Sequence, residues 1–163
     1  MKYFSYGSNM SLARLRARVP SAQLVGVFTL KGHSLKFHKI GKDGSAKCNA
    51  YFTGSDEDIV EGVVFEINSD EVARLDKAEG LGNGYEKKHV TVTNSQDYQL
   101  KALTYYATKI DDKLLPFSWY KNHVLRGAKS AGINEKYTAN IVQVKTIKDP
   151  DLKREQKELS IYE

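Results

Sequence analysis

The chain is built mostly from short apolar stretches with a two-residue period. Runs of β-branched and aromatic residues that alternate in this way, or are continuously apolar, predict strands. They lie at 2–6, 22–30, 33–40, 47–54, 58–68, 85–93, 98–108 and 141–147. The strands at 22–30 and 33–40 are joined at Lys31-Gly32, and those at 85–93 and 98–108 are joined by a polar NSQD turn.

Apolar residues at helical spacing predict a smaller number of helices. They lie at 11–18, 68–80, about 117–131 and 134–140. Leu12, Leu15 and Val19 repeat along the first, and Pro20 ends it. On the third, one face carries the apolar residues Phe117, Tyr120, Val124, Ala128 and Ala131.

The helix at 68–80 has a capping pattern at both ends. Asn68 can cap its start, with Glu71 at the matching third position, and Gly80 suits the left-handed residue that ends a helix. Its inner face is expected to carry Val72, Leu75 and Ala78.

Strands at hairpin spacing, together with these helices, favour an α+β fold with a largely antiparallel sheet that could close into a barrel. The length of 163 residues fits a single domain over 1–163. The charge-rich tail from about residue 148 is expected to lie on the surface or fray.

Composition and charge are those of an ordinary soluble protein. No apolar run is long enough to cross a membrane and no signal segment is evident, so we expect no membrane association. The single cysteine excludes an intrachain disulfide and favours a reduced, cytoplasmic setting. The net charge of +5 is scattered, which argues against nucleic acid as a partner and fits small anionic ligands equally well.

A Gly-Ser-Asn turn directly follows the first predicted strand. Gly7, Ser8 and Asn9 stand between that strand and the helix at 11–18. The first N–H groups of a helix have no partner inside it, so a carboxylate or phosphate is the expected ligand there. Gly7 would let that ligand approach the backbone closely. Taken alone, these residues could equally make a tight turn and cap the helix.

Glu79 is the last residue before Gly80, at the end of the second predicted helix. The negative end of the helix dipole disfavours a charged carboxylate, which would poise this group for proton transfer. The glycine-rich stretch 80–84 would leave its side chain room to face a ligand. The plain alternative is a solvated glutamate with no chemical role.

The motifs of metal and covalent catalysis are missing. The four histidines show neither an HExxH pattern nor paired Cys/His spacing, so no metal site is expected. Cys48 has no nearby histidine and is interpreted as a small core residue. A lone carboxylate remains as the acid–base candidate.

Three segments read together resemble the γ-glutamylcyclotransferase family. They are YFSYGSN at 3–9, RLDKAEG at 74–80, and ALTYYA at 102–107 followed by WYKNHVLRGAKSAGINEKY at 119–137. Their order and spacing are far more specific than any one block, and the resemblance extends to about Ile141. The last block is more similar to the cyclotransferases that act on γ-glutamyl-amino acids than to the glutathione-degrading or γ-glutamylamine branches.

The resemblance implies a small mixed β-barrel flanked by helices, no metal or organic cofactor, and a homodimer as in some relatives. It implies that the α-amine of a small γ-glutamyl substrate attacks its own γ-carbonyl, which forms 5-oxoproline and releases an amine or amino acid. Glu79 matches the family's catalytic glutamate. The substrate-binding loop matches Tyr6, Gly7, Ser8 and Asn9, and pocket tyrosines match Tyr120 and, by position, Tyr85.

Other functions stay open at this stage. The leaving group could be an amine, an isopeptide remnant or a protected biosynthetic intermediate. A module of the same fold could bind γ-glutamyl compounds or small anions without turnover. A nucleic-acid-binding protein ranks last, because it would need clustered positive charge.

Overall fold

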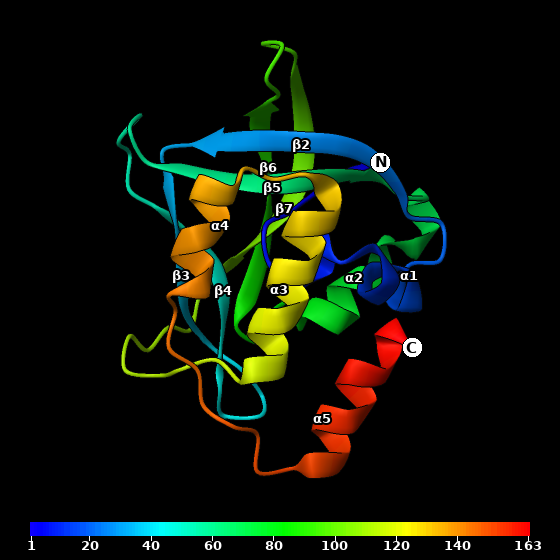
Figure 1. Ribbon diagram of the computed structural model, residues 1–163. Coiled ribbons are helices and arrows are strands. Elements are labelled where there is room, and N and C mark those ends of the chain that lie inside the picture. The colour runs from blue at the N-terminus through cyan, green and yellow to red at the C-terminus, as the bar shows by residue number, and fades with distance from the viewer.

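Five strands of the protein close into a barrel. The computed structural model describes residues 1–163, and Figure 1 shows the barrel with helices around it. In order around the barrel, its strands are β1 (Lys2–Ser5), β5 (Ile59–Glu66), β2 (Gln23–Lys31), β6 (Tyr85–Thr93) and β7 (Gln99–Ala107). Every neighbouring pair is antiparallel except β7 and β1, which are parallel and complete the closure. The predicted α+β class with a mixed, largely antiparallel barrel is therefore confirmed.

The strands β3 (His33–Ile40) and β4 (Ala46–Phe52) form a separate two-stranded sheet. β3 follows β2 after one residue, Gly32, whose φ of 75° turns the chain out of the barrel instead of closing a β2–β3 hairpin. The register of β3 against β4 shifts between Phe37 and Lys39. Because a bulge breaks the alternation of side chains, both His38 and Lys39 are buried.

The helices are α1 (Leu12–Arg18), α2 (Val72–Glu79), α3 (Ser118–Ala131), α4 (Glu135–Val142) and α5 (Leu152–Leu159). Short 3-10 helices are η1 (Ser8–Met10), η2 (Ser69–Glu71) and η3 (Ser160–Tyr162). The strand predicted at 141–147 is wrong. Helix α4 runs through Val142, and only Ile147 makes an isolated bridge, to Phe117.

The capping pattern predicted for the start of α2 is also wrong. The Asn68 side chain caps nothing, and the Glu71 carboxylate accepts hydrogen bonds from the backbone N–H and the hydroxyl of Ser21. Glu71 therefore binds Ser21, 50 residues away, instead of the backbone at the start of its own helix. Ala78 is exposed and does not lie on an inner face, whereas Gly80 has the predicted left-handed conformation, with φ of 73°.

The tail after residue 148 lies at the surface but is a helix held by specific contacts. Asp149 is fully buried and accepts hydrogen bonds from Trp119 Nε1, the Arg154 guanidinium and the backbone N–H of Asp151. Figure 1 shows α5 running beside the rest of the molecule, with the carboxyl terminus near α1. Tyr162, close to that terminus, donates a hydrogen bond to the hydroxyl of Ser11.

A close approach of α3 to η1 fixes the segment that follows β1. A Cβ placed on Gly127 of α3 would lie 2.3 Å from the backbone carbon of Met10 and 2.3 Å from the backbone nitrogen of Ser11. Only glycine permits this packing. The core beneath is formed by large side chains of the barrel and helices, among them Phe4, Leu15, Phe65, Leu75 and Val124.

Candidate active site

A small cavity opens at the end of the barrel where β1 and β7 finish and β6 begins. All seven residues that the sequence singled out line it: Tyr6, Gly7, Ser8, Asn9, Glu79, Tyr85 and Tyr120. They come from the turn after β1, the end of α2, the start of β6, and α3. The fold thus brings together residues more than 100 positions apart in the sequence.

Glu79 is held in place by the turn after β1. Asn9 Nδ2 donates a 2.6 Å hydrogen bond to Glu79 Oε1, and Arg18 Nη1 lies 3.6 Å from the same oxygen. Arg18 also donates to Asn9 Oδ1 at 3.0 Å, so the three side chains form a closed set of contacts. The Glu79 side chain is 16% exposed, which leaves part of the carboxylate accessible.

The turn itself has backbone N–H groups that its own helix does not use. The first bonds of η1 run from Met10 N–H to Gly7 C=O and from Ser11 N–H to Ser8 C=O. The N–H groups of Ser8 and Asn9 therefore have no partner within that helix. Gly7 packs closely against β4 and α3, since a Cβ there would lie 3.0 Å from Cys48 Cβ and 3.4 Å from the Tyr120 hydroxyl.

Two tyrosines hold the backbone of Cys48 from both sides. The Cys48 N–H donates to the Tyr120 hydroxyl at 2.9 Å, and the Tyr85 hydroxyl donates to the Cys48 carbonyl. Burial raises the pKa of both phenols well above their ordinary value. Both rings are therefore neutral walls of the cavity, and they attach β4 to it.

The structure adds cavity residues that sequence reasoning missed: Tyr3, Ser5, Cys48, Thr104 and Tyr105. Tyr3 accepts a hydrogen bond from Asn9 Nδ2 at 3.2 Å, and the Tyr105 hydroxyl donates to Asp76 at 2.6 Å. Burial raises the pKa of both phenols. On strands, such residues read as ordinary core positions, and only the order of strands around the barrel shows which of them face the site.

A second, wider basin adjoins the cavity and shares Ser8, Glu79, Tyr85 and Tyr120 with it. Charged side chains dominate its walls: six cations (Arg14, Arg18, Lys39, Lys42, Lys47 and Arg154) and three acids (Asp43, Glu79 and Glu158). We call it the outer basin.

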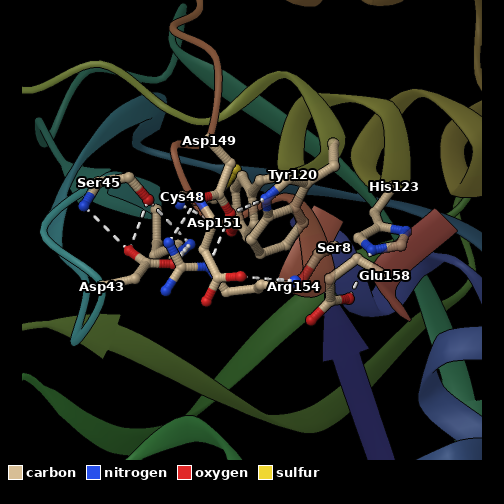
Figure 2. A network of polar contacts seen from close by, with 12 residues as sticks. Ser8, Asp43, Ser45, Cys48, Tyr120, His123, Asp149, Asp151, Arg154 and Glu158 are labelled. Carbon is tan, nitrogen blue, oxygen red and sulfur yellow. Dashed lines mark hydrogen bonds and ion pairs between the residues drawn. The ribbon is translucent and has the colours of Figure 1, made fainter. Parts of the chain in front are cut away.

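Helix α5 supplies one wall of the outer basin through an ionic network. Glu158 pairs with the Arg14 guanidinium and lies 2.9 Å from His123 Nε2. Arg14 Nε in turn donates to the Ser8 hydroxyl at 3.2 Å, which connects the tail to the turn after β1. Figure 2 shows Glu158 facing His123, and Arg154 in contact with Asp149.

No group of three or more His, Cys, Asp or Glu side chains is arranged to hold a metal ion. None of the helices has the length and apolar character needed to cross a membrane.

Comparison with known proteins places the chain and its fold in a defined family. The model of the AIG2-like family matches residues 59–141. The γ-glutamylcyclotransferase of Bos taurus is 32% identical over 139 residues, which cover 83% of this chain and 73% of that protein, and the Homo sapiens protein of the same name is 31% identical over the same lengths. A solved structure named γ-glutamyl cyclotransferase superposes with a TM-score of 0.84 at 25% identity, over 90% of this chain and 89% of the other.

The family model covers the barrel strands β5, β6 and β7, the helix α2 that ends at Glu79, and α3. The chain belongs to the γ-glutamylcyclotransferase family.

Proposed function

We propose that the protein is a γ-glutamyl cyclotransferase that converts a γ-glutamyl donor into 5-oxoproline and a free amine or amino acid. The observation that carries the proposal is the position of the Glu79 carboxylate, which lies at one cavity with the Gly7–Asn9 turn and is hydrogen bonded to it through Asn9. An acid–base group and an anion-binding turn across a small cavity are what this reaction needs.

In the proposed mechanism, the donor's α-amine attacks its own γ-carbonyl carbon and the γ-amide C–N bond breaks. Two protons leave the α-ammonium nitrogen and two arrive on the departing nitrogen, so the reaction needs no external acid or base. Glu79 accepts the first proton and delivers it to the leaving group. Because ring closure is intramolecular, the protein mainly has to hold the glutamyl chain folded back on itself.

The turn after β1 would bind the α-carboxylate or stabilise the oxyanion that develops on the γ-carbonyl. Each preorganised N–H donor to such an oxyanion is worth about 3–4 kcal/mol in enzymes where it has been removed. The buried tyrosine walls would exclude water and strengthen these contacts. Arg18 provides a positive charge beside Glu79 and Asn9.

The direct test is release of 5-oxoproline from γ-glutamyl-alanine by the purified protein, followed by chromatography. We expect turnover by the wild type and none by Glu79→Gln, with binding of the donor to Glu79→Gln retained in calorimetry. Glu86→Gln is the matched control, because Glu86 is an exposed residue of β6 outside the cavity. Binding without turnover by the wild type, across a panel of γ-glutamyl donors, would favour a non-catalytic binding module instead.

A further inference from the structure

Lys39 differs from every other cation of the outer basin. Only 5% of its surface is exposed, yet it makes no ion pair and no hydrogen bond. Arg14 pairs with Glu158, Arg18 with Glu79, Lys47 with Asp43, and Arg154 with Asp149, while Lys42 is unpaired but exposed. The Lys39 ammonium keeps only slight contact with solvent and has no anionic partner, and an anion supplied from outside would relieve the cost of this desolvation.

The backbone around Lys39 is shaped to accommodate its amine at the edge of the cavity. The bulge in β3 directs it inward, and its Nζ lies 4.5 Å from the centre of the Tyr85 ring. A Cβ on Gly84 would come within 2.9 Å of Lys39 Cε and 3.2 Å of Nζ. The amine therefore sits between a glycine and a cavity tyrosine, where the inner cavity opens into the outer basin.

The charges of the basin leave no acid available for Lys39. Each of the three acids already has a partner: Asp43 binds Lys47, Glu79 binds Asn9 and Arg18, and Glu158 binds Arg14 and His123. Burial lowers the pKa of Lys39, and the charge of Glu79 partly opposes this. The basin thus has an excess of positive charge that would attract an anionic ligand group.

We propose that the outer basin holds the departing half of the γ-glutamyl donor and that Lys39 binds a carboxylate on it. Lys39 then acts as a specificity-determining residue: donors whose leaving group is an amino acid with a free carboxylate are preferred over donors of the same size that lack it. This inference rests on the proposed function, since it assigns the part of the substrate beyond the scissile bond.

The test compares γ-glutamyl-alanine with γ-glutamyl-alaninamide, which differ in one carboxylate and hardly in size. We expect wild-type kcat/KM to be about tenfold or more higher for γ-glutamyl-alanine, as a charge-assisted contact would give. In Lys39→Met the ratio of the two kcat/KM values should fall close to one, and Lys39→Arg should retain part of the preference. Lys36→Met is the matched control, because Lys36 is an exposed lysine of the same strand outside the basin, and its ratio should match the wild type.

A wild-type ratio near one, or a ratio that Lys39→Met leaves unchanged, overturns the inference. Thermal melting of each variant shows that it is folded, and Lys39→Gln replaces Lys39→Met if the latter is not. If the wild type releases no 5-oxoproline from either donor, the proposed function is wrong. In that case, calorimetry with the same two compounds tests the anion subsite independently of turnover. Tighter binding of γ-glutamyl-alanine than of the amide, with the difference lost in Lys39→Met, supports the subsite. Equal binding of the two compounds overturns it.

Discussion

Asn9 Nδ2 lies 2.6 Å from Glu79 Oε1, which connects the first turn of the chain to a carboxylate seventy residues later. The bond spans the cavity edge between η1 and α2. Because Asn9 also accepts from Arg18 and donates to Tyr3, its amide orientation is determined by the contacts at both ends. Asn9 is therefore a positioning residue for Glu79 in addition to its place in the proposed substrate-binding turn.

Replacement of this amide by a carboxylate should impair turnover. In Asn9→Asp an acceptor faces the Glu79 carboxylate, so the hydrogen bond is lost and two like charges meet. We expect kcat/KM for γ-glutamyl-alanine to fall about 10- to 100-fold, which corresponds to about 1.4–2.8 kcal/mol. Asn122→Asp on α3, where the side chain makes no hydrogen bond, is the control. Unchanged kinetics in Asn9→Asp would show that the bond does not position Glu79.

Gly127→Ala should destabilise the protein, although this change usually stabilises a helix by about 1 kcal/mol. The new methyl group would lie 2.3 Å from the backbone of Met10 and Ser11, so α3 and η1 would have to separate. We expect the free energy of unfolding in urea to drop by about 2 kcal/mol or more. Ser130→Ala, at an exposed position of the same helix, should change it little. A Gly127→Ala protein at least as stable as the wild type would contradict this packing.

Local patterns in the sequence were enough to locate most helices and strands, but not to show which of them contact one another. The strands of the barrel follow from alternation, and the end of α2 follows from Gly80. The separation of β3 from β2 depends on the backbone conformation of one residue, Gly32. The capping box failed because Glu71 accepts its hydrogen bond from Ser21, which lies 50 residues away. Interactions across such distances leave no periodic signal.

In the candidate site, too, local motifs could be predicted and long-range contacts could not. The turn at 7–9 and Glu79 were found because each is a short motif at the end of an element, and the resemblance placed them together. The outer basin was missed, since its cations come from α1, the β3–β4 hairpin and α5 and look like solvated charges in the sequence. Arg14 and Glu158, for example, are 144 residues apart.

Cys48 should be unreactive in the folded protein although it borders the cavity. The side chain is 1% exposed, and burial raises the pKa of its thiol to about 12. Because the thiolate is the reactive form, we expect iodoacetamide at pH 8 to leave the folded protein unmodified by mass spectrometry. The denatured protein, whose one cysteine then has an ordinary thiol, should be alkylated fully. Rapid alkylation of the folded chain would contradict the closed packing of β4 against Gly7.

The network of α5 makes stability depend on pH. Burial would raise the pKa of Glu158, but the hydrogen bond with His123 and the charge of Arg14 outweigh it and lower the pKa to about 2 from an ordinary 4.5. Burial also lowers the pKa of His123 below its ordinary 6.5, against the opposing effect of Glu158. Both groups thus hold fewer protons in the folded than in the unfolded chain, so stability is lost as pH falls, first below 6.5 and then below 4.5.

Glu158→Gln isolates the carboxylate's share of this pH dependence. At pH 7.5 we expect the variant to be less stable than the wild type by on the order of 1–3 kcal/mol, because Arg14 and His123 lose their charged partner. As pH falls below 4.5 the difference in the free energy of unfolding should shrink. The unfolded wild type then takes up a proton on Glu158, whereas the folded wild type keeps this carboxylate charged, so the wild type loses stability that the variant does not have. Urea unfolding at several pH values between 7.5 and 3.5 measures both curves. Glu155→Gln, on the same helix but in no ion pair, should run parallel to the wild type. If the curve of Glu158→Gln is parallel as well, Glu158 does not anchor α5.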